Sequence, residues 1–237
     1  ITIHLDEGIY SQRSGERLSL NLLPYTNLKG AGRDQTIIDG GLLMIYDSYY
    51  SDDSVFTPPF SIMQIQDSEN TTISDLSIVG GMRSSSNDLN HAAGITIINS
   101  NVSLINTNIS GHYGGAITAI SSVLNLKNTV ISRNQGWLYN TAGIELVSSI
   151  ANLNNITFAD NIAGLYAGSI NMDDSSNLNM INSIVWNFLY EDENLPIGFS
   201  MGIDDDFSLI NIIHSNIQGG WPEGGQGNIS LDPLFVD

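Results

Sequence analysis

The chain has 237 residues, enough for one domain of ordinary size or two small ones. Its 7 basic and 25 acidic residues give a formal net charge of −18, which argues against nucleic-acid binding and against docking on anionic lipid. Hydrophobic residues make up 41%, enough for a packed core, while the absence of cysteine excludes disulfides and cysteine-ligated metals. No apolar run is long enough to predict insertion into a membrane.

The first part of the chain reads as short strands separated by glycine turns. Residues 3–10, 27–32 and 36–40 combine aliphatic side chains with glycine. Residues 48–60 are polar and aromatic and contain two prolines, so we expect a loop that projects from the body of the protein. We therefore divide the chain into opening turns and a capping region with a projecting loop, residues 1–60, and regular repeats, residues 61–237. We expect these repeats to be truncated at the C-terminus.

A phrase of small residues followed by isoleucine recurs about every 22 to 33 residues. Short alternating segments rich in Ile, Val, Leu and Thr follow it, and no segment has a helical period. A repeat of short strands predicts a parallel β-solenoid, in which each turn buries its inward residues against the turns above and below. We predict that the isoleucines of this phrase form one buried stack, and that Ile62 begins the first strand of an earlier turn in the same stack. Its members are Ile95, Ile117, Ile144, Ile170 and Ile203.

Asparagine recurs in register with this phrase. One set of four ends the second short segment of each repeat. Asparagine tolerates the left-handed backbone of a tight corner, and its amide can bond to the same amide one turn away. We therefore predict a structural ladder with side chains bonded within the corner or along the stack. Its members are Asn106, Asn128, Asn155 and Asn182.

Several short motifs carry a family resemblance. They are the opening segment 3–10, the step formed by 27–32 and 36–40, the repeat signatures 114–117 and 158–161, and the closing segment 219–237. The chain resembles the pectin-lyase-like superfamily of right-handed parallel β-helices. Its repeats resemble the polymorphic outer-membrane-protein type, and its end resembles secreted bacterial β-helix proteins of unassigned activity. The resemblance implies an all-β solenoid with three short strands per turn and about seven to eight turns, secreted or at the cell surface.

The motifs of pectin-degrading enzymes are missing or out of order. In polygalacturonases the pair of aspartates precedes the histidine motif, and an Arg-x-Lys segment follows it. Here Asp173 and Asp174 follow His112, and the sequence contains no Arg-x-Lys segment. The Gly-Arg-Pro-Trp segment of pectin methylesterases is absent. Arg133 is the last basic residue, so the repeats after it offer no Lys or Arg as the base of a lyase. These departures disfavour a polyuronate-cleaving activity.

Carboxylates on the first strands of the later repeats are compatible with glycosidase activity. The residue after each stacked isoleucine points outward, which places Glu145 and Asp204 in one column and Asp173 in the next. Two turns separate Glu145 from Asp204, about 9.6 Å at the usual strand spacing. Inverting pairs stand about 6.5 to 9.5 Å apart. Glu145, Asp173 and Asp204 are therefore catalytic candidates, although a solvated acidic face explains them more simply.

The outward side of these first strands also favours glycan binding. Trp137, Tyr139 and Tyr166 lie in the connections before this strand and can stack on sugar rings. The outward side chains of Glu145, Asn171 and Asp173 can bond sugar hydroxyls. The alternative is that the rings are buried under their own loops.

The acidic run 204–206 is a weak candidate for a calcium site. Asp204 and Asp206 share a face of a strand and are calcium candidates, although the run matches no known calcium loop. No other cofactor is expected.

Three functions remain open from the sequence. The favoured one is an extracellular adhesin, glycan-binding segment or structural shaft without catalysis, whose partner is a polysaccharide or cell-surface glycan. The second is a carbohydrate-active enzyme, a glycosidase or lyase, that uses the first-strand carboxylates. The third is a filament subunit that self-associates end to end through unpaired strand edges.

Overall fold

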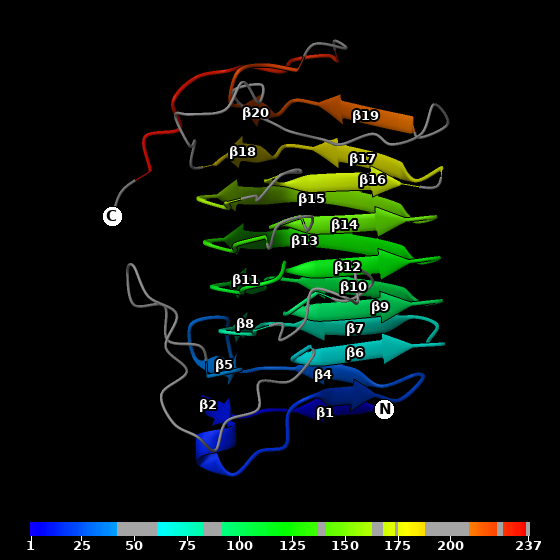
Figure 1. Cartoon of the computed structure of the whole chain (residues 1–237), viewed down its shortest axis with the longest axis vertical. Coiled ribbons are helices and arrows are strands. Elements are labelled where there is room, and N and C mark those ends of the chain that lie inside the picture. Colours follow the sequence, from blue (N-terminus) through cyan, green and yellow to red (C-terminus); the bar gives the residue numbers. More distant parts are fainter. Residues whose placement is uncertain are drawn as a thin grey trace.

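The computed structural model describes residues 1–41, 61–82, 92–136, 141–162, 168–173, 175–187, 209–221 and 225–235. The chain is a right-handed parallel β-helix, which confirms the predicted fold class. Every strand pair between these residues is parallel, and Figure 1 shows the turns stacked along the long axis from the N-terminus upward. Each regular turn adds one strand to a six-stranded sheet, sheet B, and two short strands or one long bent strand to a 14-stranded sheet, sheet A.

Sheet B contains the first strand of each turn. Its strands are β3 (Leu20–Leu22), β6 (Met63–Gln66), β9 (Ile95–Ile98), β12 (Ile117–Ile120), β14 (Ile144–Val147) and β16 (Ile170–Asp173). The predicted isoleucine stack is confirmed from β9 to β16, where Ile95, Ile117, Ile144 and Ile170 pair in register and are at most 1% exposed. Ile203 lies outside the described residues.

One register prediction was wrong. Met63 pairs with Ile95, so the earlier turn of the stack begins at Met63 and Ile62 precedes it. Both residues are fully buried. Ile62 packs into the core from the turn that enters the strand, so its apolar character does not distinguish it from the first strand residue.

Sheet A supplies the other two sides of the solenoid. Its first part contains β1 (Thr2–His4), β4 (Asn27–Lys29), β7 (Thr71–Ser74), β10 (Asn101–Ile105), β17 (Asn177–Ile181) and β19 (Leu209–Ile213). Its second part contains β2 (Gly8–Ser11), β5 (Thr36–Asp39), β8 (Ser77–Val79), β11 (Asn108–Ser110), β18 (Ile184–Trp186) and β20 (Asn216–Ile217). The long strands β13 (Val123–Ser132) and β15 (Ile150–Ala159) run through both parts.

The opening strands belong to the same solenoid as the repeats. β1 pairs with β4, which pairs with β7, and β2 continues in the same way through β5 to β8. One 3-10 turn, Gln12–Ser14, follows β2. The loop predicted at residues 48–60 lies outside the described residues.

Serines form a ladder at the corner between sheet B and sheet A. Ser100, Ser122 and Ser149 each donate their backbone N–H to the hydroxyl of the serine one turn above, at 3.0 to 3.1 Å. All three are buried. These bonds satisfy polar backbone groups that have no partner within a strand.

Asparagines occupy the next corner, where the two parts of sheet A meet. Asn155 donates its amide to Asn128 at 2.7 Å, Asn128 donates to Asn106 at 3.0 Å, and Asn106 donates to Asp75 at 3.1 Å. Their φ angles lie between +52° and +59°, the left-handed region that asparagine tolerates. Asn182 has the same backbone, at φ +54°, but among the described residues its side chain does not extend the series.

A buried ladder follows the second part of sheet A. Asn134 donates its side-chain amide to Asn161 at 3.0 Å, and Asn161 donates to Asn187 at 3.1 Å. The Asn161 amide also donates to the backbone carbonyl of Ile131 at 2.9 Å. Asn134 and Asn161 are each 1% exposed. This ladder is interior, whereas Asn155 is exposed.

His112 takes the place of asparagine one turn below. Its Nδ1 accepts the backbone N–H of Gly81 at 2.9 Å, and its Nε2 bonds the carbonyl of Ile78 at 3.0 Å. A ring that accepts at Nδ1 and donates at Nε2 is the neutral Nε2–H tautomer. Burial lowers the pKa of His112 to about 4, although the bond to Ile78 acts in the opposite direction.

The two asparagine ladders predict different costs of truncation. Asn161→Ala leaves several buried groups without partners and should destabilise the fold by about 3 kcal/mol. Asn155→Ala removes an exposed bond and places alanine at φ +59°, which should cost about 1 kcal/mol. Asn155→Gly controls for the backbone term. Denaturant unfolding measures all three, and equal costs for the two alanine variants would contradict the assignment of the interior ladder.

His112 predicts a loss of stability in acid. Because the folded pKa lies below the ordinary value of 6.5, the unfolded chain binds more protons between pH 6.5 and about 4, and stability falls as pH falls through this window. The full loss is roughly 3 kcal/mol. His112→Asn, which matches Asn134 and Asn161, should remove this part of the pH dependence in urea unfolding. A variant whose profile parallels that of the wild type would contradict it.

Candidate functional site

The outer side of sheet B carries the predicted column of polar residues. Pairing places Gln64, Thr96, Thr118, Glu145 and Asn171 one above another. They point away from the core, yet Thr96 is only 1% exposed and Thr118 only 4%. The column is therefore not an open groove along its whole length.

The chain that enters each strand covers part of this column. The backbone N–H of Ala92 donates to the hydroxyl of Thr96 at 3.2 Å, and the hydroxyl of Ser61 lies 2.7 Å from the same oxygen. The hydroxyl of Thr141 bonds Glu145 across the same four-residue spacing. Thr141 carries no signal in the sequence, because nothing in the repeat marks a residue that enters a strand and folds back over it.

Glu145 is the centre of the polar cluster at the upper end of sheet B. One of its carboxylate oxygens accepts from Thr141 and the other accepts the side-chain amide of Asn171 at 2.8 Å. Asp173 lies on the same outer side, on β16, in register with Val147. We call Glu145, Asn171 and Asp173 the acid–amide cluster.

Asn171 has an unsatisfied acceptor in this cluster. The residue is 7% exposed, and its Oδ1 is buried and accepts no hydrogen bond in the described part of the chain. A buried carbonyl without a donor costs about 1 to 3 kcal/mol. Among the described residues, this oxygen is therefore the acceptor of the cluster that lacks a donor.

The carboxyl of Glu145 holds its proton more strongly than a solvated glutamate. Burial raises the pKa of Glu145, and the nearby charge of Asp173 raises it further, while the bonds from Thr141 and Asn171 act in the opposite direction. Desolvation is the largest of these causes. Glu145 can therefore take part in hydrogen bonding as a neutral acid over a wider pH range.

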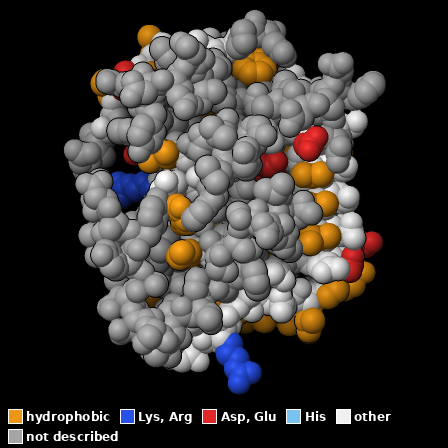
Figure 2. All heavy atoms as spheres, viewed as in Figure 1, with side chains coloured by type: hydrophobic (Ala, Val, Ile, Leu, Met, Phe, Trp, Pro, Cys, Tyr) orange, Lys and Arg blue, Asp and Glu red, His pale blue; other side chains and the backbone are white. Residues whose placement is uncertain are grey.

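An apolar column lies beside the cluster, near the ends of the sheet B strands. Ile98, Ile120 and Val147 pair in register and are half-buried, and Asp173 follows them in the same column. Figure 2 shows apolar side chains one above another along the right-hand side of this view, with acidic side chains close by. The cluster thus combines hydrogen-bonding groups with an aliphatic surface.

Several predicted site residues lie outside the described residues. They are Trp137, Tyr139, Tyr166, Asp204 and Asp206. Within the described ranges, no group of three His, Asp or Glu side chains is arranged to hold a metal ion. No helix in those ranges has the length and hydropathy needed to cross a membrane.

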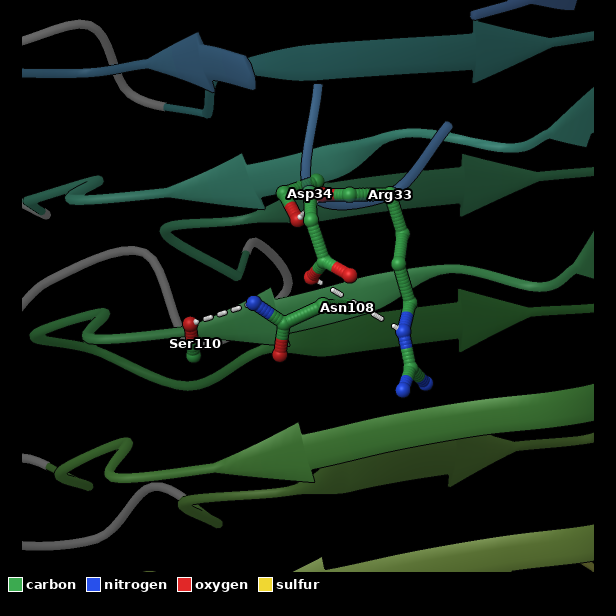
Figure 3. Close-up of polar contacts among 5 residues, drawn as sticks. Arg33, Asp34, Asn108 and Ser110 are labelled. Atoms are coloured by element: carbon green, nitrogen blue, oxygen red, sulfur yellow. Dashed lines mark hydrogen bonds and ion pairs between the residues drawn. The ribbon is translucent and has the colours of Figure 1, made fainter. Parts of the chain in front are cut away.

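The side-chain contacts drawn in Figure 3 join residues close in the sequence, in the connection before β5 and on β11. Arg33 and Asp34 form an ion pair at 4.0 Å, with side chains 46% and 90% exposed. The amide of Asn108 donates to the hydroxyl of Ser110 at 3.1 Å. Exposed pairs of this kind contribute little to stability.

Comparison with known proteins shows the class of fold. No protein-family model and no curated protein matches the chain. Solved structures do match, among them the pectin methylesterase PemA from Erwinia chrysanthemi, with a TM-score of 0.50 and 15% identity over 92% of this chain and 70% of that one. The pectin methylesterase from Yersinia enterocolitica matches with a TM-score of 0.49 and 12% identity over 98% of this chain and 87% of that one. The chain therefore has the pectin-lyase-like β-helix fold, and likeness at this identity concerns the fold alone.

The buried carboxyl of Glu145 predicts a stability loss toward alkaline pH. Because its folded pKa lies above the ordinary value of 4.5, the folded chain binds more protons in the window above that value, and stability falls as pH rises through the folded pKa. Glu145→Gln should match the wild type at pH 4 and exceed its stability at pH 8, measured by thermal unfolding. Asp34→Asn, at a side chain 90% exposed, is the control. A Gln variant that is less stable than the wild type at both pH values would contradict the prediction.

Proposed function

We propose that this chain is an extracellular β-helix protein that binds a glycan at the acid–amide cluster without cleaving it. The observation that carries the proposal is the buried, unsatisfied Oδ1 of Asn171 beside a carboxyl that two neighbours hold in place. Because that oxygen is buried, a sugar hydroxyl donates to it only once the atoms that cover it have moved aside, and the bond then removes the cost of leaving it unpaired.

The other members of the cluster suit the same ligand. Asp173 can accept further hydroxyl hydrogens, and the column of Ile98, Ile120 and Val147 offers an aliphatic surface for the C–H faces of a sugar ring. The net charge of −18 favours a neutral or cationic sugar, or an anionic one bridged by calcium.

The surroundings of the cluster complete the proposal. Trp137, Tyr139 and Tyr166 precede the strands that carry the cluster in the sequence, and they are the residues proposed to stack on sugar rings. The protein would act as an adhesin or as a glycan-binding part of a surface shaft, secreted or exposed at the cell surface, as its resemblance to secreted bacterial β-helices implies.

A second candidate function is glycoside hydrolysis by Glu145 and Asp173. They lie on adjacent strands and two positions apart, which places their Cα atoms roughly 8 Å apart. Inverting glycosidases use two carboxyl groups on opposite sides of the bond that is cleaved, and their general acid has a raised pKa. The raised pKa of Glu145 favours this alternative.

A glycan array and a reducing-sugar assay on the intact chain separate these functions. If the cluster binds, Asn171→Ala should weaken glycan binding at least tenfold, whereas Glu145→Gln should keep it. Asn108→Ala, on the second part of sheet A, is the matched control, and thermal unfolding verifies that each variant folds. Sugar release that disappears in Glu145→Gln would support the hydrolase instead. Binding that is unchanged in Asn171→Ala, or the absence of any glycan ligand, would overturn the proposed site.

A further inference from the structure

Five stacked strands at the upper end of the first part of sheet A present a continuous outer face. β10, β13, β15, β17 and β19 pair in register and lie one above another along the axis (Figure 1). Alternate residues point inward and are buried, except for the partly buried Ile210, so each strand presents three outward positions. We call these positions the asparagine face. They are Asn101, Ser103, Ile105, Val123, Asn125, Lys127, Ile150, Asn152, Asn154, Asn177, Asn179, Ile181, Leu209, Asn211 and Ile213.

This face has no acidic side chain, although the chain as a whole carries 25 acidic residues against 7 basic ones. Lys127 is its one charged position, and the others are amides, one serine and aliphatic residues. A polycation would be drawn to the acidic surfaces elsewhere, and a polyanion would be repelled by the net charge. The face therefore suits an uncharged partner.

A ladder of amides runs up the middle of the face. Asn179 donates to Asn152 at 3.2 Å, Asn152 donates to Asn125 at 2.9 Å, and Asn125 donates to Asn101 at 3.1 Å. Each bond uses one N–H of the donor, so every donating amide keeps a second N–H and each oxygen keeps further lone-pair capacity. The ladder also fixes the side-chain rotamers, which lowers the entropy cost of binding.

A shallow depression lies on the upper half of the face. Its volume is about 260 Å³, and its walls include Asn152, Asn154, Asn179, Ile181 and Asn211. The depression is smaller than the pockets of roughly 300 to 1,000 Å³ that hold drug-sized molecules, so it fits a single ring with polar edges. Asn152, Asn179 and Asn211 line one side, and Asn154, Ile181 and Ile213 line the other. These amide and aliphatic groups match a ring that has hydroxyl edges and aliphatic faces.

We propose that the asparagine face binds a neutral, hydroxyl-rich polysaccharide that lies along the solenoid axis, with one sugar ring seated in this depression. The repeat of the amides at about 4.8 Å offers donors and acceptors at regular intervals along such a polymer. This site is separate from the acid–amide cluster and does not depend on it.

The named positions of the face span a planar area of roughly 400 Å², from five strands at about 4.8 Å and five residues at about 3.3 Å. A strip of this size suits a polysaccharide held by repeated hydrogen bonds along its length.

The test is affinity electrophoresis of the intact chain in gels that contain neutral polysaccharides, namely a β-glucan, a mannan and a xylan, with polygalacturonate as the anionic control. The double variant Asn152→Ala and Asn179→Ala should weaken retardation by a neutral polysaccharide at least tenfold. Both positions are exposed, so the fold should be kept, which thermal unfolding verifies. Asn108→Ala is the matched control on the second part of sheet A, and Glu145→Gln and Asn171→Ala probe the acid–amide cluster.

The outcomes separate the two sites. Loss of retardation in the double variant alone supports the asparagine face, whatever Asn171→Ala does on the glycan array. Retardation that only Asn171→Ala abolishes would overturn the asparagine face and leave the acid–amide cluster as the site. No retardation by any of the three neutral polysaccharides, or a concentration-dependent dimer in sedimentation that the double variant abolishes, would also overturn it.

Discussion

The stacking of equivalent residues at one strand spacing is the constraint on which the rest of this structure depends. In a parallel solenoid each inward side chain contacts the same position one turn above and one turn below. Ile117, for example, pairs with Ile95 and Ile144, and all three are buried. The core is therefore a set of columns, and a residue fits its site only if it also suits its two neighbours. This explains why the isoleucine phrase tolerates unequal spacing in the sequence, because insertions change the connections and leave the columns intact.

The polar corners obey the same rule with hydrogen bonds in place of apolar contact. The position occupied by Asn161, Asn134 and His112 shows how strict the rule is. In each case a side-chain acceptor takes the backbone N–H of the turn below, and a donor bonds a carbonyl of that turn. A neutral imidazole offers one acceptor and one donor, which is the pattern of the amide that it replaces. The series ends at Gly81, in the turn below His112. A side chain has no room there, because a Cβ would lie 2.8 Å from the Nδ1 of His112.

Functional chemistry arises where a column departs from its repeat. On the outer side of sheet B, two threonines are followed by Glu145 and then Asn171. The carboxyl of Glu145 lies at a buried position that threonine hydroxyls occupy in the turns below, and this burial raises the pKa of Glu145. On the first part of sheet A, by contrast, the proposed site consists of the repeated asparagines themselves, because an unbroken column of asparagines gives an array of identical amide groups. The two proposed sites thus use opposite properties of one architecture.

The sequence by itself determined the fold and much of the register. The repeat of small residues before isoleucine was sufficient to align four turns of sheet B and to identify Glu145 and Asn171 as neighbours, because column stacking turns a sequence phrase into a spatial contact. Only the tertiary structure decided exposure. The sequence alone did not separate the interior ladder of Asn134 and Asn161 from the exposed one of Asn128 and Asn155, since asparagine suits both corners. Nor did it reveal that Thr96 and Thr118 are buried. At Thr96 the covering residues come from the entry to its own strand and from another turn, and no periodicity marks them.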